Sequence, residues 1–345
     1  MNYPTSVSEP TAIVCKQKAH KNIAFMKALA DRDKVRLRPH FKTHQSLEIG
    51  SWFREYGVSV CAVSSPSMAR KFVDGGWVDV LIALPANLGS SADYNELSKK
   101  AKLGLIGDSV ELIRGVDSSL EHDVDFWIEV DAGYGRTGVK WDDKEKLMAV
   151  KNAIDVSQHI NLRGVLIHAG NSYDCRGIAE IESLAAVVKK RVLVSNETVG
   201  GEISYGDTPT CGIGCDTSAY DEIRPGNFVF YDLVQEEIGS CKREDIAISL
   251  ACPVIGVYPE KGAVVVHGGA VHLSKDTMND HFGIAFQIEE SGRWVEVGKV
   301  TKISQEHGTI EGDVARVKMG EVVHILPVHS CLLVDCMGDL MIVDA

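Results

Sequence analysis

Short apolar or β-branched runs alternate with longer amphipathic stretches from about residue 34 to residue 232, and this alternation restricts the possible folds most strongly. Strands separated by helical segments are typical of parallel βαβ units. Eight such runs predict a closed, TIM-like (β/α)8 barrel, with a doubly wound open sheet as the main alternative. The predicted strands are residues 35–38, 59–63, 78–83, 103–106, 125–130, 163–168, 201–205 and 228–232. The predicted helices include residues 45–55, 66–74, 94–101, 143–154 and 179–195.

Polar and glycine-rich segments follow several of the predicted strands. In a barrel, functional residues gather just after the C-terminal ends of the strands. Lys42 follows the first predicted strand, residues 131–138 the fifth and residues 168–173 the sixth. Residues 206–210 follow the seventh, and residues 224–227 lie just ahead of the eighth. This clustering exceeds what turn chemistry alone requires and indicates a site at one mouth of the barrel.

After about residue 244 the pattern changes to alternating segments separated by Gly, Pro and Asp, which predicts a smaller antiparallel β domain. The opening segment, residues 11–16, also has the composition of a strand and is expected to join that domain. We therefore predict a joining strand in residues 1–20, a barrel in residues 21–240 and a β domain in residues 241–345. Its strand candidates include residues 247–257, 262–267, 283–287, 295–303, 314–317 and 332–334.

Lys42 lies in the sequence RPHFKTH, residues 38–44, directly after the first predicted strand. A lysine beside two histidines at a strand end suits a Schiff-base lysine, whose amine must be neutral to attack an aldehyde. Partial burial and neighbouring positive charge lower the pKa of a lysine and supply that neutral amine. The alternative is an ordinary solvated lysine, so this motif gains weight only with a second one, PVHSC, at residues 327–331.

His329 and Cys331 lie two residues apart in this second motif, on what resembles a strand or its edge. Both side chains are therefore expected on one face. Imidazole and thiolate together form a two-ligand platform for Zn²⁺, with water or substrate in the remaining positions. A thiolate disfavours Mg²⁺ and Ca²⁺, which prefer oxygen. Because His-x-Cys also occurs by chance, the sequence leaves this metal site in the β domain as a hypothesis.

The loops at the barrel mouth offer groups for an anion and a planar ring. Residues 206–210 and 224–227 supply hydroxyls and glycine amides where such barrels often bind phosphate, although plain turns are the alternative. His168 and Tyr173 are candidates to stack on a ring or to hydrogen-bond to it. Arg136 either offers its guanidinium to an oxygen anion or pairs with a carboxylate of the barrel.

Composition excludes several other classes of protein. The 36 basic and 48 acidic side chains give a net charge of −12, which argues against nucleic acid or an anionic membrane as partner. No apolar stretch is long enough to span a bilayer, and the first residues lack the features of a signal peptide. Nine cysteines without framework spacing indicate reduced thiols, so we expect a cytoplasmic protein.

Taken together, these segments resemble the fold-type III pyridoxal-phosphate enzymes, whose barrel and β domain are those of alanine racemase. Within them, the chain is most similar to the D-serine dehydratase and D-threonine aldolase family, from about residue 9 to residue 335. Seven segments in the order of that family carry the resemblance. They are RPHFKTH (38–44), VDAGYGRTGV (130–139), HAGNSY (168–173), GDTPT (206–210), EIRPGNFVFYD (222–232), EHG (306–308) and PVHSC (327–331).

The resemblance implies roles for particular residues. Lys42 is expected to hold pyridoxal phosphate covalently, with His168 near the cofactor ring and Arg136 near its phenolic oxygen. His329 and Cys331 match the metal pair of the family, so zinc is the second expected cofactor. The positions expected to hold the cofactor and its phosphate are Tyr173, Thr208, Gly226 and Asn227. A homodimer is expected by the same resemblance.

The resemblance further implies that zinc binds the β-hydroxyl of a D-amino acid, and D-serine would then give pyruvate and ammonia. A thiolate at Cys331 favours this dehydration, because aldolase members often carry a carboxylate at that position. The alternatives are retro-aldol cleavage to glycine and an aldehyde, dehydration of 3-hydroxy-D-aspartate, and a non-catalytic protein that binds pyridoxal phosphate. Asp207 and the histidine-rich residues 267–272 depart from the expected pattern and leave the substrate open.

Overall fold

The computed structural model describes residues 3–344 and divides the chain into two compact units. One unit, here called the barrel unit, comprises Ile23–Gly226. The other, here called the β unit, comprises Met1–Asn22 together with Asn227–Ala345. The first long helix, α1 (Lys16–Asp33), contains the division near the N-terminus.

The barrel unit is built on parallel strands joined side by side in the order β2-β10-β9-β8-β6-β5-β4-β3. A parallel bridge between His40 and Ala62 joins the two ends of this series, so the predicted (β/α)8 barrel is confirmed. Its interior contains a buried cluster to which five strands contribute one residue each: Ala62, Leu81, Ile106, Trp127 and Leu166. The strands are β2 (Arg36–Leu37), β3 (Cys61–Val63), β4 (Asp79–Pro85), β5 (Lys102–Gly107), β6 (Val124–Asp131), β8 (Ile160–His168), β9 (Glu202–Gly206) and β10 (Glu222–Ile223), with β7 (Val139–Lys140) paired to β6.

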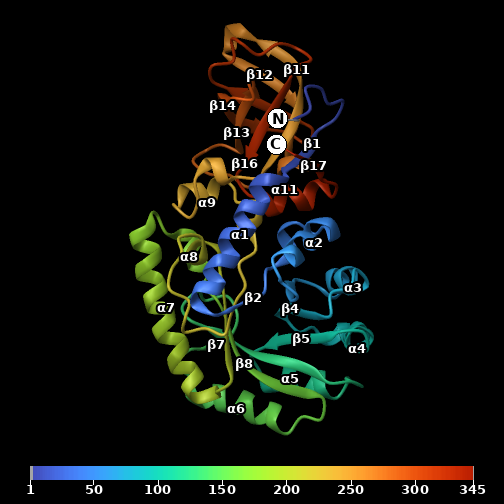
Figure 1. Cartoon of the computed structure of the whole chain (residues 1–345), viewed down its shortest axis with the longest axis vertical. Helices are drawn as coiled ribbons and strands as arrows, with labels where there is room; N and C mark the ends of the chain where they lie inside the picture. The colour runs from blue at the N-terminus through green and yellow to red at the C-terminus, as the bar shows by residue number, and fades with distance from the viewer. Residues whose placement is uncertain (1–2, 345) are drawn as a thin grey trace. The chain divides into compact units, whose positions relative to one another are not determined.

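The helices of this unit lie outside the ring of strands (Figure 1). Serine side chains start several of them, because each accepts a hydrogen bond from a backbone N–H three residues on, as Ser46, Ser65 and Ser109 do. The helices are α2 (Leu47–Glu55), α3 (Pro66–Asp74), α4 (Ser91–Ser98), α5 (Val110–Asp117), α6 (Lys144–Asp155), α7 (Ile178–Val199) and α8 (Thr208–Gly212). The helical segments predicted from sequence all overlap members of this set.

The eighth strand differs from the prediction. Residues 228–232 were expected to form it, but β10 pairs with β9 and β2 in that place. The apolar residues of the predicted segment are buried in the 3-10 turn η4 (Asn227–Val229) and just after it, and Asp232 caps α9 (Leu233–Glu237). A strand of two residues is too short to give a periodic pattern. The correction places Arg224 and Gly226 after the eighth strand, at the C-terminal end where barrel sites lie.

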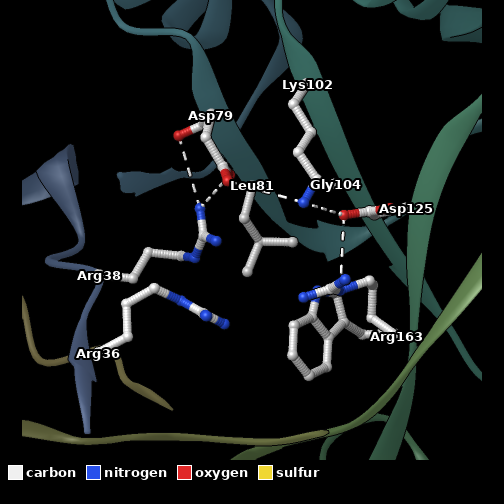
Figure 2. A pocket seen from close by; sticks show the side chains of 9 residues that line it. Arg36, Arg38, Asp79, Leu81, Lys102, Gly104, Asp125 and Arg163 are labelled. Atoms are coloured by element: carbon white, nitrogen blue, oxygen red, sulfur yellow. Dashed lines mark hydrogen bonds and ion pairs between the residues drawn. The ribbon is translucent and has the colours of Figure 1, made fainter. Parts of the chain in front are cut away.

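Charged side chains gather near the N-terminal ends of the barrel strands (Figure 2). Arg38 is buried and contacts two carboxylates, Asp79 at 2.7 Å and Glu222 at 3.0 Å. Lys102 contacts Asp125 at 3.0 Å. Buried charges are tolerated only when they are paired, so these ion pairs hold the strand ends together. We therefore assign this face of the barrel to the stability of the fold.

Replacing Glu222 by Gln is expected to destabilise the barrel by about 3–5 kcal/mol, because it removes the buried carboxylate that Arg38 and Arg36 share and leaves Arg38 with Asp79 alone. Burial alone raises the pKa of Glu222, but Arg38, Arg36 and Arg224 outweigh burial and lower that pKa to about 2. The folded pKa thus lies below the unfolded value of about 4.3. This carboxylate therefore contributes stability above about pH 4, which is lost as the pH falls towards about 2.

Urea unfolding of the wild type and of Glu222→Gln over this pH range measures the effect. Glu121→Gln is the matched control, since its partner Lys99 lies 3.5 Å away on the exposed surface and such pairs contribute little. Equal free energies of unfolding for the wild type and Glu222→Gln at neutral pH would contradict the assigned role.

The β unit is a twisted sheet in the order β12-β15-β14-β13-β16-β11-β1-β17, and a further β12–β11 pairing closes most of it into a barrel. The N-terminal strand β1 (Thr11–Cys15) belongs to this sheet, as predicted, and pairs antiparallel with β11 and parallel with β17. The other strands are β11 (Ile248–Tyr258), β12 (Ala263–His267), β13 (Gly283–Ile288), β14 (Trp294–Ile303), β15 (His307–Glu311), β16 (Val322–Pro327) and β17 (Met341–Val343). Three short helices, α9, α10 (Ala270–Leu273) and α11 (Ser330–Met337), also belong to this unit.

Two predicted strands of the β unit are wrong. Residues 314–317 form turns, and residues 332–334 lie inside α11. The buried positions of α11 are Ser330, Leu333 and Val334, a spacing of three and four residues that is typical of a helix. The predicted placement of His329 and Cys331 on a strand is therefore also wrong.

Within residues 3–344, no helix is both long enough and apolar enough to cross a membrane. All nine cysteines are free thiols, and most of them are buried.

Candidate active site

Lys42 lies in η1 (Phe41–Thr43), the 3-10 turn that follows β2 at the C-terminal end of the barrel. The ring of Phe41 contacts those of His44, Phe72 and Trp77 with centroids 4.5–4.8 Å apart, which fixes the backbone on either side of the lysine. The N–H of Lys42 donates to Nδ1 of His40 at 3.3 Å. The side chain of Lys42 is exposed.

Two histidines beside Lys42 are held neutral. Burial, together with the charges of Arg136, Lys42 and Arg224, lowers the pKa of His168 to about 4. The hydrogen bond that its Nδ1–H donates to the Gly206 carbonyl at 2.8 Å acts in the opposite direction. Burial also lowers the pKa of His40, again assisted by Lys42 and Arg224. Neutral rings surrounded by permanent cations form a site suited to an anionic ligand.

Arg136 and His168 are linked through an aromatic ring. The guanidinium of exposed Arg136 lies 5.3 Å from the ring centroid of Tyr134, and that ring meets His168 edge-on at 5.7 Å. Asp131, the alternative partner considered for Arg136, accepts instead from the backbone of the turn, at 2.8 and 3.0 Å. Arg136 therefore presents its guanidinium at the same mouth of the barrel as His168.

The segment 206–210 leaves a buried hydroxyl without a partner. Asp207 caps α8 by accepting from the N–H of Thr210 at 2.7 Å, and it also accepts from the hydroxyl of Ser172 at 3.1 Å. The side-chain oxygen of Thr208 is buried and has no hydrogen-bond partner among the described residues. Buried polar atoms are nearly always paired, so this hydroxyl is available to an added ligand.

Gly226 lies against the segment that carries Lys42. A Cβ on Gly226 would come within 2.7 Å of the backbone oxygen of His40, so this close approach requires glycine. Arg224, two residues earlier, is buried and donates to the carbonyl of Ile167 at 2.9 Å. Tyr173 lies half-buried in η3 (Gly170–Asp174), which follows β8.

The predicted metal pair lies at the start of α11 in the β unit. His329 is the residue before the helix, and its imidazole contacts the thiol of Cys331. Its Nδ1 lies 3.2 Å from the carboxylate of Asp276. Burial alone lowers the pKa of His329, but Cys331, Asp232 and Asp276 outweigh burial and raise it to about 9. One ring nitrogen thus faces a carboxylate and the ring also meets a thiol, an arrangement typical of a metal-binding histidine.

Asn227 belongs to the same network. Its amide donates to Asp232 at 2.5 Å and to the hydroxyl of Ser330 at 3.0 Å, and it lies 3.8 Å from the sulfur of Cys331. Asp232 also accepts from the backbone N–H of Ser330 at 3.0 Å, which fixes the first turn of α11. This residue, predicted to bind the cofactor, therefore contacts the predicted metal ligand.

The structure thus gathers the predicted residues into two groups. Lys42, Arg136, His168, Tyr173, Thr208 and Gly226 belong to the barrel unit, whereas Asn227, His329 and Cys331 belong to the β unit. Sequence reasoning gave no role to His40, Arg224 or Asp276. The first two lie inside recognised segments, but nothing near Asp276 pointed to a contact made across 53 residues.

Two family profiles together match nearly the whole chain. The profile described as alanine racemase, N-terminal domain, matches residues 14–233, and the one described as putative serine dehydratase domain matches residues 247–343. D-threo-3-hydroxyaspartate dehydratase of Delftia sp. (strain HT23) is 31% identical over 348 residues, 94% of this chain and 91% of the relative. The chain belongs to the D-serine dehydratase family, with the barrel of alanine racemase.

Other relatives support this family assignment. D-serine dehydratase of Dictyostelium discoideum is 27% identical and covers 98% of this chain and 94% of its own length. The solved structure of the Delftia dehydratase superposes with a TM-score of 0.91 and 27% identity, over 99% of this chain and 97% of that one. D-threonine aldolase of Arthrobacter sp. matches less of the chain, 66%, at 27% identity. The protein is thus a pyridoxal-phosphate-dependent lyase of this family.

The barrel residues fit the cofactor of the family. Pyridoxal phosphate requires an amine, donors for a phosphate and a surface for its ring. The exposed amine of Lys42 meets the first requirement, and the unpartnered hydroxyl of Thr208 suits the second. His168 ends β8 and Tyr173 lies in η3 directly after it, and both supply flat side chains for the third.

Asp276 is expected to orient His329 towards a metal. Replacing it with Asn removes the negative acceptor of Nδ1–H and should weaken metal binding by roughly 10–100-fold. The dissociation constant, measured by competition with a chelating dye, checks this expectation. Asp280→Asn in the same loop is the matched control, because Asp280 is exposed. Equal affinity in the wild type and Asp276→Asn would contradict the role of Asp276.

Proposed function

We propose that this protein is a pyridoxal-phosphate- and zinc-dependent dehydratase of β-hydroxy-D-amino acids, with D-serine converted to pyruvate and ammonia. The observation that carries the proposal is the pair of His329 and Cys331, with Asp276 on the other side of the imidazole. Histidine and thiolate are zinc ligands that leave positions open for a substrate. The solved structures of D-threo-3-hydroxyaspartate dehydratase include a variant, with one cysteine replaced by alanine, in a metal-free form, which supports a metal in this branch of the family.

When bound, pyridoxal phosphate supplies an electron sink for the charge left at the α-carbon, and zinc supplies a Lewis acid for the β-hydroxyl. Lys42 holds the cofactor through its amine and, when that amine is free, takes the α-proton of the substrate. D-serine then loses its β-hydroxyl as water. The released enamine hydrolyses to pyruvate and ammonia.

The surrounding cations bind and orient the anionic groups. Arg136 is exposed at the mouth and is available to a carboxylate or phenolate, while buried Arg224 adds positive potential at His168. His168 is fixed by its bond to the Gly206 carbonyl, so its other nitrogen points away from that bond as a neutral acceptor. Thr208, Gly226 and Asn227 would hold the phosphate, and Tyr173 would lie against the cofactor.

A second candidate is dehydration of 3-hydroxy-D-aspartate. It is favoured by the 31% identity to the Delftia enzyme and by the free guanidinium surface at Arg136, which suits a second substrate carboxylate. Retro-aldol cleavage is the third, because D-threonine aldolases belong among the relatives. A non-catalytic role in binding pyridoxal phosphate has less support, since the β unit carries a metal pair with an orienting carboxylate.

One assay separates these reactions. Purified protein, loaded with cofactor and zinc, is incubated with D-serine, D-threo-3-hydroxyaspartate and D-threonine, and with the L-isomers as controls. A 2-oxo acid with ammonia supports dehydration, and the fastest substrate identifies the preference. Glycine with an aldehyde would transfer the assignment to the aldolases. Activity that survives complete zinc removal would refute the metal step, and inactivity on every substrate would favour the non-catalytic role.

We also propose that the protein acts in the cytoplasm as a homodimer. Its nine free thiols suit a reducing compartment, and its net charge of −12 disfavours nucleic acid and anionic membranes. The mass of the purified protein in solution, measured by light scattering, tests the dimer.

A further inference from the structure

His267, His272 and Glu306 converge on the β unit, away from the His329–Cys331 pair in sequence. Nε2 of His267 lies 3.6 Å from the carboxylate of Glu306, and Nε2 of His272 lies 3.9 Å from it. The two imidazoles meet nearly at right angles, with centroids 5.3 Å apart. Across residues 3–344, this is the one group of three or more His, Cys, Asp or Glu side chains whose ligand atoms all lie within 4.8 Å of one another.

The backbone holds these three residues in place. His267 ends β12 opposite His307 of β15, and Glu306 directly precedes that strand. The N–H of Gly268 donates to the carbonyl of Glu306 at 2.8 Å. A Cβ on Gly269 would lie 2.5 Å from two carbonyl oxygens of the same turn, so glycine is needed for this close approach. The turn before β15 is therefore pressed against the segment that leads from β12 into α10.

The chemistry of these groups suits a zinc-like cation. Two imidazoles and one carboxylate form a donor set that binds Zn²⁺ with one position left for water. Magnesium and calcium prefer sites built from oxygen alone. The side chains of His267 and Glu306 are about one-third and nearly one-half exposed, which gives an ion access.

We propose that His267, His272 and Glu306 form a second metal site, which takes one divalent ion of the zinc class and is independent of the His329–Cys331 pair. The ion cross-links the end of β12, α10 and the turn before β15. His272 lies four residues before Asp276, so the ion also anchors the segment that reaches His329.

Metal binding at His272 changes one hydrogen bond. Its Nδ1 now accepts from the N–H of Gly269 at 3.1 Å, so the neutral ring carries its proton on Nε2, towards Glu306. An ion at Nε2 requires the proton on Nδ1, and the Gly269 hydrogen bond is then lost. Amide exchange at Gly269 should therefore become faster when the site is filled, whereas a simple histidine–glutamate pair predicts no response to metal.

The test uses protein that lacks the other site. In the double variant His329→Ala, Cys331→Ala, cobalt(II) titration should show one tightly bound equivalent, with visible absorption but no thiolate charge-transfer band. Adding His267→Ala or Glu306→Gln should abolish that equivalent, whereas adding His159→Ala should leave it unchanged. His159 is the matched control because it pairs with Asp123 at 3.1 Å on the surface of the barrel unit, outside any three-ligand group described.

Zinc should also raise the melting temperature of the double variant, and this rise should disappear with Glu306→Gln, which keeps the size of the side chain. No cobalt bound by the double variant, or the same amount bound after Glu306→Gln, would overturn the second site. These readouts need neither substrate nor pyridoxal phosphate, so a failure of the proposed dehydratase reaction would leave them unaffected.

Discussion

Lys42→Ala is expected to lower the rate of pyruvate release from D-serine by at least roughly 10²–10⁴-fold, the usual contribution of a positioned base. The variant should also lose the covalently bound cofactor, because Lys42 is the amine whose charge acts on both His40 and His168 at the barrel mouth. Absorbance of the purified protein before and after borohydride, followed by peptide mapping, measures the loss. Pyruvate formation gives the rate.

Two further variants make the result specific to Lys42. Lys42→Arg keeps the positive charge but offers no neutral amine, so it should be as inactive as Lys42→Ala. Lys140→Ala removes an exposed lysine of the same unit, 3.0 Å from Asp142, and should behave as the wild type. A Lys42→Ala protein that stays yellow after dialysis and releases pyruvate would contradict the role of Lys42 in holding the cofactor and in catalysis.

Cys331→Ala is expected to remove one equivalent of metal and to lower dehydration by roughly 10²–10³-fold. Lewis-acid assistance contributes several kcal/mol, and each 1.4 kcal/mol or so corresponds to tenfold in rate. The cofactor spectrum should not change, since Lys42 lies elsewhere in the sequence. Metal analysis of the protein by mass spectrometry, together with pyruvate release, measures both effects.

Cys336→Ala is the control, because this thiol is exposed on the same helix, α11. It should keep both metal and activity. If Cys331→Ala kept its full metal content and its rate, the thiolate would have no part in the reaction. If it kept the metal but produced glycine from D-threonine, the side chain at residue 331 would instead select between the two bond cleavages.

The alternation of strands and helices was sufficient to predict the barrel and seven of its eight strands. Apolar residues recur every two residues in a strand and every 3.6 residues in a helix, so each element can be recognised from its own short segment. The two-residue strand β10 escaped notice, since Glu222–Ile223 is too short to show any period. The apolar run at residues 228–232 was taken for a strand because burial in a turn and burial in a sheet select the same residue types. Only pairing with β9 and β2 distinguishes them.

The surroundings of the candidate metal pair also depend on tertiary contacts that the sequence does not reveal. The spacing of His329 and Cys331 predicted both side chains on one face of a strand. The two side chains are in contact, but at the start of a helix. No pattern in the sequence pointed to Asp276, whose contact with His329 closes a loop of 53 residues. Likewise, the richness of residues 267–272 in histidine was visible, but the approach of Glu306 to them was not.

The sequence by itself determined the fold class, the family and the types of residue available for chemistry, because each depends on local periodicity or on short segments in a fixed order. Tertiary structure alone decided which strand completes the barrel, which carboxylate supports each histidine and which hydroxyl stays without a partner. Those properties depend on side chains that meet across long stretches of chain. Such contacts are set by the packing of whole elements, which no local pattern encodes.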